Sequence, residues 1–347
     1  MARVQNRPGV KFGPSETGNG GDRISWAGKH RWSSGRSLIK KVFHGFQYKL
    51  GIALCVLLVF PGSVAAAEGP LARQWGELLA LISLGGEAQK ANSLPFAGTE
   101  SRLDFGTDAQ SHALVFIPPS SVTAKNTIVL FVHGGGWDMG TPEQYRFIGR
   151  FFAERGFPTI LAGYRLAPRF VFPAQIEDAV ASLRAGLSYF EEKGIHAQRL
   201  ILGGHSAGAE LASLIAYGPW LSDVERGRIS GLFLMSGVLD FSMCTQGRIS
   251  TLIDKYIGTP ANREAADPMS YPHGGQGKAA LLLHGAEDPL VDPANSLHFA
   301  QSLNGGPSPN AEVRLIARAH HTDTLNLFLR RTAETDILDR WLSGIEP

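Results

Sequence analysis

From residue 101 onward, short apolar runs alternate with longer amphipathic stretches, and this alternation constrains the possible folds more than any other feature. Several of the apolar runs are continuous, which is typical of strands that are covered on both faces. The pattern therefore predicts an α/β fold, with a mostly parallel central sheet and helices on both faces. The predicted strands are 112–117, 127–132, 159–163, 199–203, 231–235, 279–284 and 312–316, all of them central and buried. The predicted helices are 142–155, 173–190, 207–217, 292–303 and 324–342.

The charge of the 347-residue chain is unevenly distributed. Residues 1–49 carry ten Lys or Arg against two acidic residues, whereas the remainder carries 23 basic against 29 acidic residues. A mildly acidic globular region offers no basic stripe to a phosphate backbone, so we do not expect a nucleic-acid partner. The charge pattern instead separates a basic N-terminal segment from the rest of the chain.

The N-terminal segment has the layout of a secretory signal. An uncharged run at 50–60 follows three lysines, and small residues place a cleavage site after Ala67. We therefore expect residues 1–67 to be a basic leader with a signal peptide, and the protein to be exported, either periplasmic or secreted. The alternative is an uncleaved membrane anchor, because 50–67 is close to the shortest helix that crosses a membrane. The long leader leaves the true start codon open.

Residues 68–347 are expected to form a single globular domain. About 280 residues are enough to bury a sizeable core. Only Cys244 follows residue 67, so stability must come from this core rather than from a disulfide. The stretch 241–278 breaks the alternation, being long, polar and rich in Gly, Pro and Ser. Insertions of this length are usually functional, and we expect this one to line the substrate pocket with the segment before residue 103.

The pentapeptide Gly204-His205-Ser206-Ala207-Gly208 joins the predicted strand 199–203 to the predicted helix 207–217. Ligands of open α/β sheets bind beyond the carboxyl ends of the strands, where this serine lies. Gly-x-Ser-x-Gly is the pattern of a strained turn that exposes a nucleophilic serine, with glycines where strand and helix pack closely. The positive end of the helix favours negative charge beside the serine. We therefore predict that Ser206 is a nucleophile.

Three other loops that follow predicted strands carry the groups a serine nucleophile needs. The loop 133–137 contains three consecutive glycines, whose unobstructed N–H groups suit the binding of an oxyanion. In the loop after 279–284, Asp288 is the predicted triad acid, because Asp292 is better explained as the cap of the next helix. The pair His320-His321 follows the last strand and supplies the base, since the order Ser, Asp, His fits a triad.

These residues resemble the α/β-hydrolase superfamily, and within it the group of hormone-sensitive-lipase-like carboxylesterases, feruloyl-esterase-like proteins and kynurenine formamidases. The resemblance covers roughly 103–342. It is carried by 133–137, by 204–208 and by the segment Tyr164-Arg165-Leu166-Ala167-Pro168, which looks like the Tyr-Arg-Leu-Ala-Pro segment of these esterases. His205, beside the serine, matches the formamidase and feruloyl-esterase-like branch.

The resemblance also implies roles for further residues. Backbone N–H groups of Gly135, Gly136 and Ala207 match those that form the oxyanion hole of the family. His321 aligns with the family's triad histidine, whereas His320 stands where the family has glycine. Arg165 and Asp178 are expected to hold the scaffold together by polar contacts.

The predicted function is that of a serine carboxylesterase, which cleaves small to medium acyl esters through an acyl-enzyme. We expect Trp137 and His205 to bind the substrate, a small-molecule ester, and we expect no metal and no cofactor. An arylformamidase acting on a substrate such as N-formylkynurenine is the enzymatic alternative. A catalytically inactive scaffold that binds a ligand is the alternative from another class, although all three triad residues are present. The oligomeric state has no signal in the sequence.

Overall fold

The computed structural model describes residues 70–271, 278–305 and 310–345. The predicted leader and signal peptide lie outside these ranges and stay predictions. Among the helices in the described ranges, we find none with the length and apolar character needed to span a membrane.

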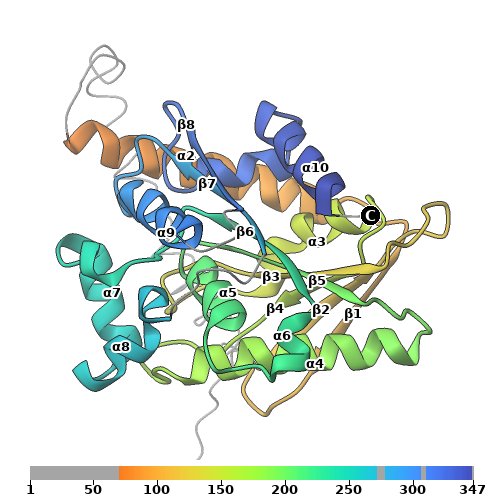
Figure 1. Cartoon of the computed structure of the whole chain (residues 1–347). Helices are drawn as coiled ribbons and strands as arrows, with labels where there is room; N and C mark the ends of the chain where they lie inside the picture. The colour runs from red at the N-terminus through yellow and green to blue at the C-terminus, as the bar shows by residue number, and fades with distance from the viewer. Residues whose placement is uncertain (1–69, 272–277, 306–309, 346–347) are drawn as a thin grey trace, which may run out of the picture. The chain divides into compact units, whose positions relative to one another are not determined.

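Within the described residues, eight strands form one sheet in the order β1-β2-β4-β3-β5-β6-β7-β8 (Figure 1). The antiparallel pairs are β1 with β2 and β2 with β4, whereas β3 to β8 run parallel. The predicted α/β class with a mostly parallel sheet is thereby confirmed. The strands are β1 Thr99–Asp104, β2 His112–Ile117, β3 Thr127–Val132, β4 Thr159–Ala162, β5 Arg199–His205, β6 Ile229–Met235, β7 Ala279–Gly285 and β8 Ala311–Ile316.

Helices cover both faces of the sheet, with α3 and α10 on one face and α4 and α5 on the other (Figure 1). The α-helices are α2 Pro70–Ser93, α3 Arg146–Ala153, α4 Ala174–Glu192, α5 Ala207–Tyr217, α6 Asp223–Gly227, α7 Gly247–Ile257, α8 Arg263–Ala266, α9 Ala294–Asn304 and α10 Ala333–Ile345. Short 3₁₀ helices are η2 Pro142–Tyr145, η3 Phe241–Met243, η4 Pro260–Asn262, η5 Pro268–Ser270 and η6 Asp323–Phe328.

The central strands are apolar at consecutive positions because each face of the sheet has its own core. In β3, Leu130 and Val132 pack into the core beneath α4 and α5, whereas Val129 and Phe131 pack into the core beneath α3 and α10. Successive side chains of a strand point to opposite faces, so a strand buried on both faces needs an unbroken apolar run. All six residues of β3 are buried.

Two strands differ from the expectation of central, buried strands. β8 forms at the predicted place but is partly exposed along its length, because it is the edge strand and pairs only with β7. β1 was not predicted, since Thr99–Asp104 reads as a polar stretch; it pairs with β2 at the opposite edge and is also partly exposed. The strand that was not predicted and the strand that is less buried than predicted are thus the two edge strands of the sheet.

Two predicted helices are divided, and others were missed. The range 142–155 contains η2 followed by α3, and 324–342 contains η6 followed by α10. A new helix starts at Ala333 because Thr332 Oγ1 accepts a hydrogen bond from the N–H of Thr335, at 3.3 Å. The unpredicted α2 contains the pair Gly85-Gly86, which disfavours a helix by propensity alone. Its end is held instead by Asn92, whose Oδ1 accepts from the N–H of Phe147 at 2.7 Å.

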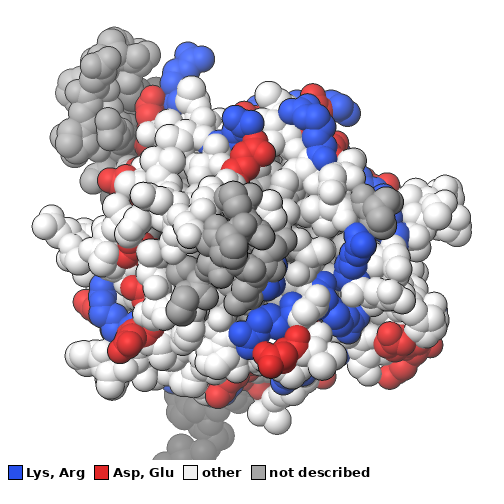
Figure 2. Space-filling model, viewed as in Figure 1, with Lys and Arg blue, Asp and Glu red and all other residues white. Residues whose placement is uncertain are grey.

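Polar contacts between elements complete the scaffold. Arg165 donates to Asp178 through Nε at 2.8 Å and through a terminal nitrogen at 2.9 Å, as expected for a pair that joins two segments. Charged side chains of both signs lie on the face shown in Figure 2. Arg184 of α4 and Glu225 of α6 form an ion pair that joins these two helices, with Nε 2.8 Å from Oε1.

Candidate active site

Ser206 lies between the end of β5 and the start of α5, in a strained backbone conformation. Its φ is 56° and its ψ is −121°, a region that non-glycine residues rarely adopt. Both flanking glycines are required by close packing: a Cβ on Gly204 would lie 2.2 Å from the carbonyl oxygen of Gly208, and one on Gly208 would lie 2.1 Å from that of Val132. The sequence pattern therefore corresponds to a tight strand-to-helix turn, as predicted.

A continuous chain of hydrogen bonds links Ser206, His321 and Asp288. His321 Nε2 is 2.9 Å from Ser206 Oγ, and His321 Nδ1 is 2.7 Å from Asp288 Oδ2. The structure thus brings together the three residues predicted to be catalytic. His320 turns away from this chain and bonds Asp323 Oδ2 through its own N–H at 2.8 Å and through Nδ1 at 3.1 Å. Of the two adjacent histidines, only His321 has the position of a base for Ser206.

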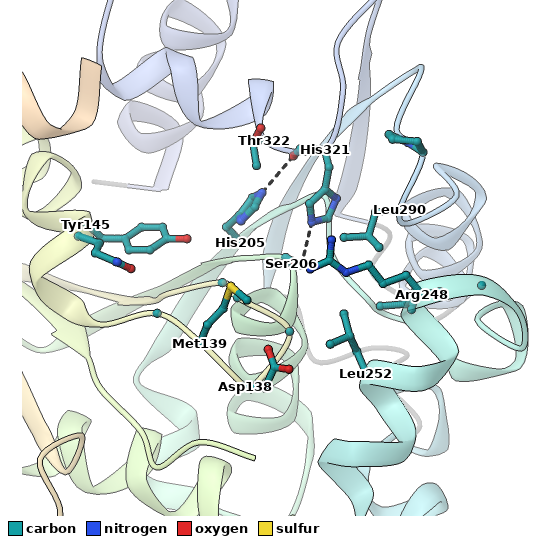
Figure 3. Close-up of a pocket in the computed structure, with 18 of the residues that line it drawn as sticks. Asp138, Met139, Tyr145, His205, Ser206, Arg248, Leu252, Leu290, His321 and Thr322 are labelled. Atoms are coloured by element: carbon teal, nitrogen blue, oxygen red, sulfur yellow. Dashed lines mark hydrogen bonds between the residues drawn. The ribbon is translucent and has the colours of Figure 1, made fainter. Parts of the chain in front are cut away.

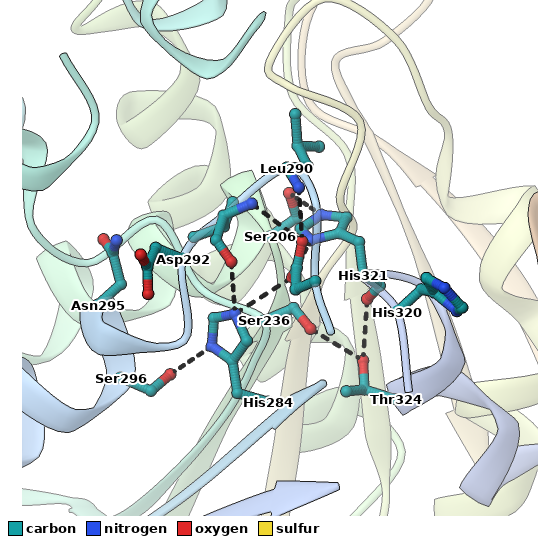
Figure 4. A network of polar contacts seen from close by, with 12 residues as sticks. Ser206, Ser236, His284, Leu290, Asp292, Asn295, Ser296, His320, His321 and Thr324 are labelled. Carbon is teal, nitrogen blue, oxygen red and sulfur yellow. Dashed lines mark hydrogen bonds and ion pairs between the residues drawn. The ribbon is translucent and has the colours of Figure 1, made fainter. Parts of the chain in front are cut away.

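Asp288 is buried and has hydrogen-bond donors on both of its oxygens. Oδ1 accepts from the N–H groups of Leu290 and Val291, at 2.8 and 2.9 Å. Oδ2 accepts from His321 and also from His284 Nε2, at 3.1 Å (Figure 4). Burial alone would raise the pKa of Asp288, but the charge of His321 and the hydrogen bonds from both histidines hold it below its ordinary value. Asp288 therefore stays an anion beside His321.

His284 was not singled out from the sequence, although it contacts the predicted triad acid. It is fully buried at the end of β7, and its Nδ1 lies 2.7 Å from Ser296 Oγ on α9. Because Nε2 donates to Asp288 and to the carbonyl oxygen of Val291, Nδ1 accepts from the serine hydroxyl. The signal in the sequence is a histidine in an otherwise apolar strand, four residues before the acid.

The glycine loop after β3 lies against the serine turn. A Cβ on Gly134 would come within 3.3 Å of Ser206 Cβ, and positive φ values of 128° at Gly135 and 60° at Gly136 require glycine. His133 fixes the loop through Nδ1, 2.9 Å from the carbonyl oxygen of Gly134. Ala207 is the first residue of α5, so its N–H has no acceptor within the helix. The three groups predicted to form an oxyanion hole thus come from two loops that meet at Ser206.

His205 supports the His321 backbone and also lines the pocket. Its Nε2 lies 3.0 Å from the carbonyl oxygen of His321, to which it donates. Burial, together with the nearby charge of His321, lowers the pKa of His205 to about 3. His205 is therefore a neutral donor at physiological pH and keeps the loop that carries His321 next to the serine turn.

Trp137 was expected to bind the substrate, but its side chain lies in the core and not in the cavity. Its side chain is fully buried and does not belong to the described lining of the pocket. The indole stacks on Tyr256 with ring centroids 4.4 Å apart, and its Nε1 donates to Glu210 Oε2 at 3.0 Å. Trp137 points inward because a buried acceptor on α5 satisfies its N–H. It therefore anchors the glycine loop rather than binding the substrate.

A cavity of about 790 Å³ opens above Ser206 and His321 (Figure 3). Its size suits a small-molecule ligand. Apolar walls come from Met139, Leu252 and Leu290, and the predicted insertion contributes 246–249 together with Leu252. The expectation that the insertion lines the pocket is met, whereas the described lining includes no residue before 103.

Comparisons with known proteins agree with this geometry. A family model of the alpha/beta hydrolase fold matches residues 129–313, which is more than half of the chain. The chain belongs to the α/β-hydrolase fold family. The part matched by the hydrolase model includes the glycine loop, Ser206 and Asp288 and ends before His321. The superfamily resemblance found in the sequence is confirmed.

Several α/β-hydrolase relatives are enzymes of known type. The chain is 26% identical over 153 residues to kynurenine formamidase of Danio rerio, covering 44% of the chain and 48% of the relative. It is 39% identical over 199 residues to an acetyl-hydrolase of Streptomyces hygroscopicus, covering 52% of the chain and 63% of the relative. Each match therefore spans less than two thirds of the relative. The carboxylesterase EstE1, cloned from a metagenomic library, has the same fold, with a TM-score of 0.62 and 21% identity over 82% of this chain and 98% of that chain.

Proposed function

We propose that this chain is a serine hydrolase of carboxylic esters. The observation that carries the proposal is the hydrogen-bonded chain from Ser206 Oγ through His321 to Asp288, with distances of 2.9 and 2.7 Å. It lies at the floor of a cavity of suitable size and beside glycine N–H groups. The acetyl-hydrolase among the relatives and the carboxylesterase that has the same fold support the same class of reaction.

The proposed reaction has two steps of acyl transfer. His321 Nε2 takes the proton of Ser206 Oγ as that oxygen attacks the ester carbonyl carbon, and the N–H groups of Gly135, Gly136 and Ala207 bind the oxyanion. His321 then gives the proton to the departing alcohol, which leaves an acyl ester on Ser206. Water, deprotonated by His321, attacks this ester and releases the carboxylic acid. Asp288 keeps the imidazole oriented and stabilises its charged form.

The direct test compares the wild type with Ser206→Ala on 4-nitrophenyl acetate. Without the nucleophile, turnover should fall by about 10⁴-fold or more, because triad residues act as a unit. A variant that keeps wild-type turnover would exclude Ser206 as the nucleophile.

An arylformamidase is the second candidate, favoured by the match to kynurenine formamidase. The same triad would attack the formyl carbon of an N-formyl aniline and release formate and the amine. Relative kcat/KM for N-formylkynurenine and for acetyl, butyryl and feruloyl esters separates the two candidates. We expect the short acyl esters to be turned over best.

We also propose that the protein is exported, on the basis of the sequence of residues 1–67 alone. N-terminal sequencing of the protein from its native cells tests this. A mature chain beginning just after Ala67 is expected, whereas a chain that retains 50–67 would favour the anchor.

A further inference from the structure

One cation that lines the cavity has no hydrogen-bond or ion-pair partner among the residues that the structure describes. Arg248 lies in the first turn of α7, and in Figure 3 its side chain extends into the cavity toward Ser206 and His321. Within the described ranges, it takes part in no hydrogen bond and no ion pair. Arg248 is exposed and can be solvated at little cost, but because it reaches toward a nucleophile it is also placed to meet whatever binds there.

The other charges around the cavity leave that of Arg248 unbalanced. Asp138 is the acidic residue of the described lining, and its Oδ2 is 3.0 Å from Lys255 Nζ, also on α7. The first turn of α7 contains no acidic residue, and Gln246 before it makes no capping hydrogen bond with its side chain. Asp138 is thus paired with Lys255, Asp288 is paired with His321, and His205 is neutral, so Arg248 is the charged side chain of the described lining that has no partner of opposite sign.

The apolar residues of the cavity indicate where a neutral part of the ligand would lie. Leu252 stands one helical turn after Arg248 on α7, and Leu290 borders the loop that carries Asp288. A ligand seated over Ser206 would thus meet apolar side chains with a guanidinium at one side. A guanidinium binds a carboxylate through two parallel N–H donors, which gives both affinity and orientation.

We propose that Arg248 forms a subsite for a carboxylate, so that the preferred substrates are small esters that bear an anionic group besides the scissile ester. This rests on the proposed ester hydrolysis. The carboxylate belongs either to the acyl part or to the alcohol part of the ester, and the chemistry of recognition is the same in both cases. Arg248 binds the substrate and takes no part in proton transfer.

The test uses two pairs of esters that differ in charge. In the first pair, monomethyl glutarate carries a carboxylate on the acyl side and methyl pentanoate does not. In the second pair, 4-acetoxybenzoate carries a carboxylate on the alcohol side and 4-methylphenyl acetate does not. For each pair, kcat/KM of the anionic ester is divided by that of the neutral ester. Comparing this ratio between the wild type and Arg248→Gln cancels intrinsic reactivity. Arg340→Gln, with the same charge change at an exposed position of α10, is the matched control.

In at least one pair, the ratio should fall about 10-fold or more in Arg248→Gln, mainly through KM, because a charge-assisted hydrogen bond is lost. It should fall further in Arg248→Glu, recover in part in Arg248→Lys and stay unchanged in Arg340→Gln. Turnover of the neutral esters should persist in all these variants, which shows that they are folded.

Ratios that stay within about twofold in both pairs would overturn the carboxylate subsite while leaving ester hydrolysis intact. If the wild type hydrolysed neither member of either pair, the proposed ester hydrolysis itself would be wrong, and the subsite with it.

Discussion

At the scale of single residues, two adjacent histidines have different surroundings. His321 is buried between Ser206 and Asp288, whereas His320 is partly exposed and its Nδ1 lies 3.1 Å from Asp323 Oδ2. We expect His321→Ala to lower kcat by about 10⁴-fold or more. His320→Ala should stay within about threefold of the wild type, because its side chain contacts Asp323 and neither Ser206 nor Asp288. Steady-state ester hydrolysis measures both, and equal losses would contradict the assignment of the base.

His284 contacts Asp288, the proposed triad acid, and a pair of substitutions separates the effect of this hydrogen bond from that of packing. Replacing it by Leu removes a donor to the Asp288 carboxylate, so kcat should fall about 10- to 100-fold with little change in KM. His284→Gln places an amide N–H near the position of Nε2 and should recover much of kcat. The comparison requires kcat and KM for both variants. If the two lost activity equally, the hydrogen bond to Asp288 would not explain the effect.

The sequence was sufficient to predict which residues lie in the site, but not which side chains they contact. Ser206 and Asp288 were predictable because each lies in a loop that directly follows a predicted strand. Ser206 is also flanked by the glycines that a tight strand-to-helix turn requires. The choice between His320 and His321 came only from resemblance, since the side-chain directions of two neighbours depend on the packing of the loop. Trp137 was misjudged because its acceptor, Glu210, lies 73 positions away in the chain.

At the scale of elements, Glu210 joins three parts of the site. It lies on α5 one turn after Ser206, is fully buried, and accepts from Trp137 in the glycine loop and from the Tyr256 hydroxyl on α7, each at 3.0 Å. Burial raises the pKa of Glu210 well above its ordinary value, and the two hydrogen bonds offset this only in part. The position of the glycine loop is therefore coupled to that of the insertion through one carboxyl group.

This coupling gives a pH dependence of stability. Because the pKa of Glu210 is higher in the folded than in the unfolded chain, the folded protein binds the proton more tightly, and its stability falls as pH rises above the unfolded value of about 4.5. Glu210→Gln has no proton to lose. The unfolding free energy of the variant relative to the wild type should therefore increase with pH, by up to about 1.4 kcal/mol per unit.

Urea unfolding from pH 4 to pH 8 measures this difference. The exposed Glu264→Gln serves as the control, and its difference from the wild type should stay flat. A flat difference for Glu210→Gln as well would show that Glu210 ionises in the folded protein as it does in the unfolded chain.

At the level of elements, the sequence was most informative where both faces are buried. The apolar runs of β3 and β7 are those expected of strands that are covered on both faces. The edge strands β1 and β8 are both partly exposed, and only β8 was predicted, because β1 is polar and has no apolar run. The short helices of 241–278 depend on contacts with the rest of the fold, such as that of Tyr256 with Trp137, which local propensity does not reveal.

At the scale of the whole molecule, the sheet brings segments that are distant in sequence together at the carboxyl ends of its parallel strands. Ser206 follows β5, Asp288 follows β7 and His321 follows β8, and these strands are parallel, so the three loops meet at the carboxyl ends. Ser206 and His321 are 115 positions apart in the chain, but in the fold Ser206 Oγ and His321 Nε2 are 2.9 Å apart. The alternation of elements was sufficient to predict that the site lies at the carboxyl ends of the strands, because the loops that follow parallel strands all lie at that end of the sheet.

The most direct test of the account is labelling of the intact protein with a fluorophosphonate, followed by mass mapping of the modified peptide. Such a probe reacts with a serine only when the serine is activated as a nucleophile. We predict one adduct, on Ser206, that is absent from Ser206→Ala and strongly slowed in His321→Ala. An unmodified protein, or an adduct on another residue with Ser206 untouched, would contradict the central claim that Ser206, His321 and Asp288 form a working catalytic triad.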